Sequence, residues 1–75
     1  MGEVSSEYLK IATLAEINLI RQEYDEAGRL YKKAIVLDPE AIGLHQEFLA
    51  ESRRLMEALD TASEDRLRIE QILVG

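Results

Sequence analysis

The chain has 75 residues and no cysteine, and 47% of its residues are hydrophobic while only 5% are aromatic. This length accommodates one small domain, and the lack of cysteine excludes disulfides and thiolate chemistry. Fifteen acidic residues against nine basic ones give a net charge of −6, which argues against a nucleic-acid partner because such binding relies on basic residues at phosphates.

Helix-forming residues dominate the composition, so the predicted fold class is all-α. The first predicted helix follows Ser5 or Ser6, either of which can cap it, and its body YLKIATLAEINLIRQ contains no Gly or Pro. Its residues form two stripes at helical spacing, so we expect this helix to contact neighbours on two sides. One stripe is Tyr8, Ile11, Leu14, Ala15 and Asn18, and the other is Leu9, Ala12, Glu16, Leu19 and Ile20.

The second predicted helix is short and ends at a proline. Asp25 stands where an N-cap would begin this helix, and the run Asp38-Pro39-Glu40 marks its end. Asp38 is then expected to cap the next helix, with Pro39 at the first helical position, where proline is favoured.

A third, amphipathic helix is predicted over residues 40–59, and a fourth over residues 63–74 after a short break. Ser63 is the expected cap of the fourth helix, and the acidic residues that follow it suit the positive end of the helix dipole. A helix this short is not stable alone, so it must pack on something. Its apolar residues are Leu67, Ile69, Ile72 and Leu73.

The spacing of small residues, tyrosines and one proline in residues 8–41 resembles a tetratricopeptide repeat (TPR), a unit of roughly 34 residues. With Tyr8 at the first position, the fold-defining positions of such a unit are occupied by Ala15, Tyr24, Ala27, Tyr31, Ala34 and Pro39. The resemblance implies an antiparallel helical hairpin in which small residues meet where the helices cross. It predicts a single domain over residues 1–75, with the repeat at 8–41, a capping helix at 40–59 and a short C-terminal helix at 63–74.

A second repeat at the same spacing would begin at Ile42, and its residues do not fit the pattern. Leu49 would take the position of a small residue, Thr61 and Arg68 the two alanine positions, and Leu73 the proline position. The third helix is therefore interpreted as the helix that covers the open end of a repeat array.

In this family the first helix of each repeat lines a groove, so the resemblance implies a protein–protein interaction module, an adaptor or assembly element, that binds a protein or peptide. The implied groove residues are Leu9, Ala12, Glu16, Leu19 and Ile20. Members that bind a terminal carboxylate carry Lys and Asn at the positions of Ala12 and Glu16. Because Glu16 would instead repel a carboxylate, we expect a partner segment that binds through apolar side chains. The competing interpretation is that the chain itself buries this stripe.

Two other functions remain open at this point. Because a single repeat leaves the first helix without a neighbour on one side, the chain could be a self-associating domain, through that helix or through Leu67, Ile69, Ile72 and Leu73 of the last one. The stretch YDEAGRLYKKAI is also similar to the second helix of microtubule-interacting and transport domains, which are three-helix, peptide-binding bundles.

No catalytic residues, metal ligands or cofactor are predicted, and the chain is not expected to be an enzyme. His45 is the only histidine, and the glycines are too scattered to form a phosphate-binding loop. The N-terminal run MGEVSSEYLK is polar, and no apolar run approaches the roughly 18 residues of a membrane span. We therefore expect a soluble cytoplasmic protein without membrane insertion.

Overall fold

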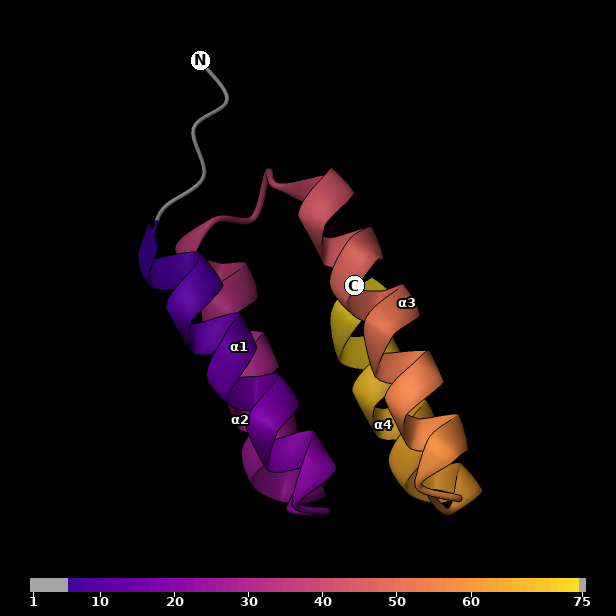
Figure 1. Cartoon of the computed structure of the whole chain (residues 1–75). Helices are drawn as coiled ribbons and strands as arrows, with labels where there is room; N and C mark the ends of the chain where they lie inside the picture. The colour runs from indigo at the N-terminus through magenta and orange to yellow at the C-terminus, as the bar shows by residue number, and fades with distance from the viewer. Residues whose placement is uncertain (1–5, 75) are drawn as a thin grey trace.

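The computed structural model describes residues 6–74, and its regular secondary structure there consists of α-helices joined by short turns (Figure 1). Its elements are α1 (Ser6–Ile20), α2 (Tyr24–Leu37), α3 (Ile42–Ala58) and α4 (Ser63–Val74). The predicted all-α class is thus confirmed. Of the two cap candidates for the first helix, Ser6 is the first residue of α1 and Ser5 lies outside the described residues.

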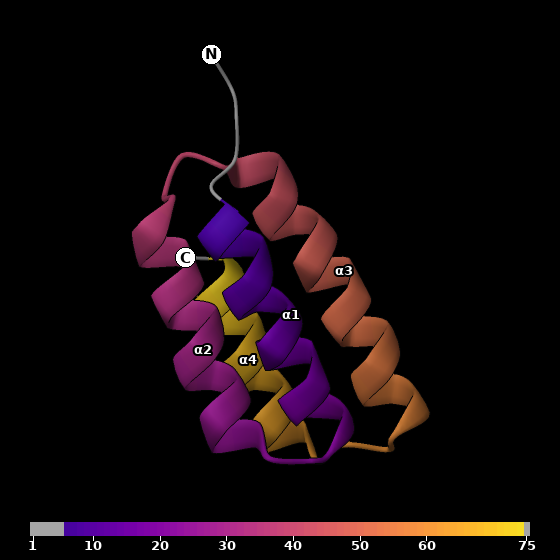
Figure 2. The ribbon, with the colours of Figure 1, turned by 60° about the vertical axis from the view of Figure 1, so that its left-hand side comes forward.

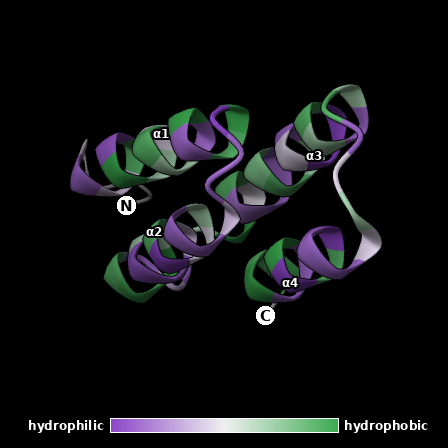
Figure 3. Cartoon of the chain, turned by 90° about the horizontal axis from the view of Figure 1, so that it is seen from below, coloured by the Kyte–Doolittle hydropathy of each residue, from purple (hydrophilic) through white to green (hydrophobic). Residues whose placement is uncertain are grey.

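The helices form two antiparallel hairpins that lie side by side. α1 pairs with α2, α3 pairs with α4, and the second hairpin packs so that α3 lies against α1 and α4 against α2 (Figure 3). α1 and α3 consequently run in the same direction on one side of the molecule, as Figure 2 shows. Since a fourth helix packs on the second, a three-helix bundle does not describe this chain.

Both hairpins turn through the same helix-ending motif. After α1, Gln22 adopts the left-handed conformation with a φ of 63°, and its N–H donates to the carbonyl of Leu19 at 2.9 Å. The N–H of Glu23 then donates to the carbonyl of Asn18, also at 2.9 Å, which completes a Schellman motif. The same pair of bonds recurs after α3 around Asp60, whose φ is 56°. Neither turn contains the glycine that usually marks such an ending, so the sequence carries no simple signal for them.

Two predicted helix starts differ from the structure. Asp25 lies inside the first turn of α2, whose N-cap is Glu23 and which has no side-chain cap bond. Asp38 ends α2 instead of starting α3, because its N–H bonds back to the last carbonyls of α2 while its own carbonyl accepts the N–H of Ala41 at 3.2 Å. Pro39 therefore lies in a turn between the helices, and α3 begins three residues later than position 39, at Ile42.

The core is built where small residues let the helices approach. Ala15 and Ala27, one on α1 and one on α2, are 0% exposed and both belong to the core. Tyr31 and Ala34 are also buried, Tyr24 is half-buried, and Pro39 is exposed. The fully buried side chains of the second hairpin are Ser52, Met56 and Ile69.

The burial pattern of α1 repeats on α3 at a separation of 37 residues. Tyr8 and His45, which are both buried, have this separation and are joined by a hydrogen bond of 2.6 Å between the phenol oxygen and Nδ1. Ser52, also buried, stands 37 residues after Ala15, and its hydroxyl donates to the Leu49 carbonyl at 2.7 Å, so this small residue leaves no polar atom unpaired. A repeat length of roughly 34 residues does not reveal this correspondence, because it puts Leu49 at the position that a small residue should occupy.

Two further contacts fix how the hairpins stack. The hydroxyls of Tyr24 and Thr61, again 37 residues apart, form a hydrogen bond of 2.8 Å between the start of α2 and the turn before α4. At Gly28, a Cβ atom would lie 3.2 Å from Cδ1 of Ile72 and 3.6 Å from Cδ1 of Ile69. The glycine thus makes room for side chains of α4, which compensates for its poor helix propensity.

Candidate functional site

The five groove residues implied by the resemblance do not all reach the surface. Ala12 and Leu19 are 1% and 0% exposed, because they lie on the side of α1 that packs into the core. Their assignment to a partner-binding surface is therefore corrected. Leu9 and Ile20 are exposed, at 42% and 53%, and Glu16 is half-buried.

A groove does run between α1 and α3, and it contains two of the implied residues. We call it the α1–α3 groove. Both helices contribute apolar side chains to it, and both contribute carboxylates. Its lining residues are Leu9 and Glu16 from α1, and Leu44, Glu47, Phe48 and Glu51 from α3.

An aromatic cluster beneath the groove supports Phe48. The Phe48 ring lies on the buried Tyr8 ring, with 6.0 Å between their centroids and a tilt of 58°. Tyr8 is itself held by its hydrogen bond to His45, and their ring centroids are 5.4 Å apart. Phe48 is consequently fixed from below by core residues while it remains partly open to the groove.

The surroundings of Glu16 in the groove disfavour its ionised form. The pKa of Glu16 is raised, first because partial burial removes water from its carboxylate and second because the negative charge of Glu51 lies nearby. Glu51 has a long ion pair of 3.5 Å with Arg54, on the exposed side of α3. Within residues 6–74, no ion pair neutralises Glu16 or Glu47.

A buried hydroxyl lies close to the same negative charges. Tyr31 is 1% exposed, and its hydroxyl has no hydrogen-bond partner among the described residues. Its pKa is raised mainly by burial and then by the charges of Glu16 and Glu51. The hydroxyl therefore stays protonated, and it donates to neither carboxylate.

Replacing Glu16 by glutamine is expected to stabilise the free protein at neutral pH. The raised pKa means that the folded state disfavours the ionised carboxylate, so Glu16 lowers stability once the pH rises above 4.5, its ordinary pKa, and has no such effect below it. Because the group remains partly solvated, we expect a gain of about 0.5 kcal/mol or less at pH 7. Urea unfolding of both proteins at pH 7 and pH 3.5 measures the difference, which should vanish at the lower pH. A loss of stability at pH 7 would contradict the assigned electrostatics.

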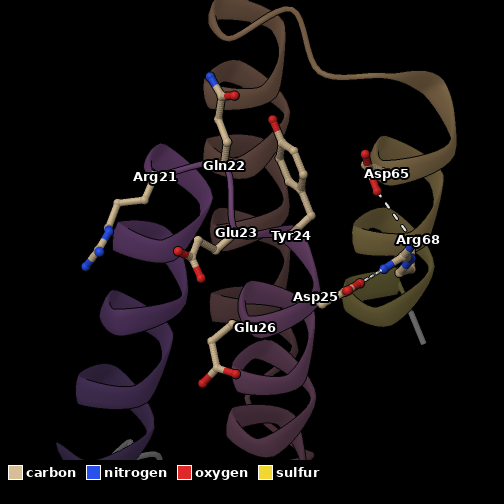
Figure 4. Close-up of a pocket in the computed structure, with 8 residues that line it drawn as sticks. All are labelled: Arg21, Gln22, Glu23, Tyr24, Asp25, Glu26, Asp65 and Arg68. Atoms are coloured by element: carbon tan, nitrogen blue, oxygen red, sulfur yellow. Dashed lines mark hydrogen bonds and ion pairs between the residues drawn. The ribbon is translucent and has the colours of Figure 1, made fainter.

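A second hollow lies where the two hairpins turn, and its arginine Arg68 already pairs with two of its carboxylates. Figure 4 shows Arg68 reaching from α4 to Asp25 on α2 and to Asp65 on its own helix. The Arg21 side chain, from the end of α1, points away from this group. We interpret the ion pair between Arg68 and Asp25 as a contact that holds α4 against α2.

The remaining candidate residues are placed as follows. On α4, Ile69 and Leu73 are buried within the chain, Ile72 is half-buried and Leu67 is 58% exposed. Only Leu67 of this set therefore offers most of its side chain to a second copy. No group of His, Asp or Glu residues within 6–74 is placed to hold a metal ion.

Sequence reasoning missed the α3 half of the groove. Leu44, Glu47, Phe48 and Glu51 recur at positions three and four apart, which is the signature of one helix face. The interpretation of the third helix as a covering helix places none of these four residues at a binding surface, whereas the structure places them along the edge of the core. The signal that could have identified it is the pair Glu47 and Glu51, whose like charges share that face with apolar residues.

None of the helices in residues 6–74 is both long enough and apolar enough to cross a membrane. Comparison with models of known protein families, with curated proteins and with solved structures found no match to this chain.

Proposed function

We propose that the chain is a non-enzymatic protein-interaction module, similar to a tetratricopeptide repeat, that binds a segment of a partner protein in the α1–α3 groove. The resemblance of residues 8–41 supports the class of function. The observation that carries the site is the group of apolar side chains in that groove, Leu9, Leu44 and Phe48, which the chain leaves open between two helices.

This kind of surface suits a peptide segment. Phe48 is fixed from below by Tyr8, so it does not have to be ordered when a partner binds, and pre-ordered aromatic side chains are favoured anchors at interfaces. A groove between two parallel helices also accommodates an amphipathic helix, which places side chains three and four residues apart along it. Adaptor or assembly roles follow from such binding.

A second candidate function, self-association, is favoured by the outer surface of α1. Leu14 and Ile17 are 44% and 45% exposed although they are large and apolar. A dilution series by sedimentation separates the two functions, because a chain that stays monomeric at micromolar concentrations leaves only recognition of a different protein.

The groove assignment predicts that Leu9→Asp abolishes partner capture and Leu67→Asp does not. Both leucines are about half exposed, at 42% and 58%, but only Leu9 lines the groove. A charge among the apolar contacts is expected to weaken binding at least about tenfold, the cost of a central contact residue. The measurement is affinity capture from the native cell with the wild type and both variants, after circular dichroism has shown both to be folded. A partner captured equally by all three proteins would contradict the assignment.

A further inference from the structure

Both helices that form the groove contribute carboxylates to it, beside its apolar side chains. Glu16 stands on the α1 side, and Glu47 and Glu51 stand on the α3 side. Only Glu51 has a cationic partner within residues 6–74, and that contact is a long one of 3.5 Å to Arg54. The other lining residues are Leu9, Leu44 and Phe48, so apolar side chains share the groove with these three carboxylates, which we call the acidic rim.

The carboxylates of the acidic rim destabilise the unbound protein, and a bound cation would offset this effect. Glu16 and Glu51 repel one another closely enough to raise the pKa of Glu16, and Glu16 is partly withdrawn from water. The Tyr31 hydroxyl beneath them is buried and donates to no acceptor in residues 6–74, so it does not stabilise their charge. A positive side chain between the two walls of the groove would face ionised carboxylates from both helices in a partly desolvated place, where charge-assisted bonds are stronger than in water.

From this arrangement we infer that the occupant of the α1–α3 groove is a basic amphipathic segment of another protein. Its apolar side chains pack on Leu9, Leu44 and Phe48, and its Lys or Arg side chains meet the carboxylates of the rim. This inference rests on the proposed function and specifies the partner's chemistry. The net charge of −6 favours the same choice, because it attracts basic segments at a distance and repels acidic ones.

The dimensions of the groove set the length of the segment that it can bind. Leu9 and Glu16 are seven positions apart on α1, as are Leu44 and Glu51 on α3, and each pair spans about 10 Å along its helix. An occupant of about two to three helical turns covers this length. Such an occupant carries apolar residues on one face of its helix. Basic residues one turn apart, on either side of that face, reach the carboxylates of both α1 and α3.

Three helical peptides test the inference directly. They share one length and one apolar face and differ only at the flanking positions, which are all Lys, all Gln or all Glu. Titration into the ¹⁵N-labelled full chain is followed by amide shifts, and affinities are measured by fluorescence anisotropy. We expect the Lys peptide to shift amides around Leu9 and Phe48 and to bind at least about tenfold more tightly than the Gln peptide, with an affinity that falls as salt rises.

A matched pair of variants separates a local effect from the general charge of the chain. The double variant Glu16→Gln with Glu47→Gln is expected to weaken the Lys peptide about tenfold and to leave the Gln peptide unchanged. The control, Glu57→Gln with Glu64→Gln, removes the same charge from exposed positions that do not line the groove and should bind like the wild type. An equal loss in both double variants would overturn the inference, because it would reduce the binding to attraction by net charge.

The peptide series also distinguishes this inference from the proposed function. If the Gln or Glu peptide binds in the groove as tightly as the Lys peptide, the basic specificity is wrong and the groove remains a binding site. If none of the three shifts the amides that line the groove, both the specificity and the groove assignment fail.

Discussion

The variant Leu19→Asp is expected to be unfolded in buffer at 25 °C. Leu19 is 0% exposed and belongs to the hydrophobic core cluster. Truncating a buried leucine alone costs about 2–5 kcal/mol, and an unpaired buried carboxylate adds its desolvation cost. A domain of this length has a total stability of about 4–11 kcal/mol, so the two terms together consume most or all of it. Loss of the helical circular dichroism signal and of amide dispersion would show the result.

The neighbouring substitution Ile20→Asp supplies the control, because it introduces the same charge one residue away. Ile20 is 53% exposed, so its side chain does not have to be removed from water in the folded state. We expect a change in unfolding free energy within about 0.5 kcal/mol, as for most surface substitutions. A folded Leu19→Asp with the stability of Ile20→Asp would mean that α1 is rotated and that Leu19 faces the groove after all.

Leu19 also shows that the sequence does not decide which face of α1 enters the core. This helix carries apolar residues on more than one side, so its periodicity predicts two contact faces without saying which one enters the core. Four helices were nevertheless predictable, because each remaining segment is amphipathic and is separated from the next by a break in the pattern. The details that failed were local ones, such as Asp38, whose cap-like side chain stands at the end of α2.

The candidate site was harder to predict because it depends on how two hairpins stack. Leu9 and Glu16 could be taken from the resemblance, but their neighbours on α3 depend on the separation of 37 residues that pairs Tyr8 with His45. That separation is fixed by contacts distant in sequence, including the space left by Gly28 for α4. Periodicity within one helix contains no information about such stacking, so the α3 half of the groove required the structure.

Ile69→Ala is expected to lower the unfolding free energy by about 2–4 kcal/mol, the cost of truncating a fully buried branched side chain. Ile69 is 0% exposed, and its Cδ1 would lie 3.6 Å from a Cβ at position 28, so it sits where α4 packs on α2. A helix of 12 residues has little stability of its own, so loss of this contact should free α4 before the rest of the chain. Urea unfolding measures the total loss, and amide hydrogen exchange shows whether α4 opens first.

Leu67→Ala on the same helix is the matched control, since this leucine is 58% exposed and its truncation should cost no more than about 0.5 kcal/mol. Equal unfolding midpoints for the two variants would show that α4 does not dock on α2 through Ile69. Measuring both at two protein concentrations separates docking within one chain from exchange between copies. A loss that depends on concentration would assign the buried face of α4 to a second molecule, because only association couples stability to concentration. We expect the same loss at both concentrations, because the Ile69 contact is made within one chain.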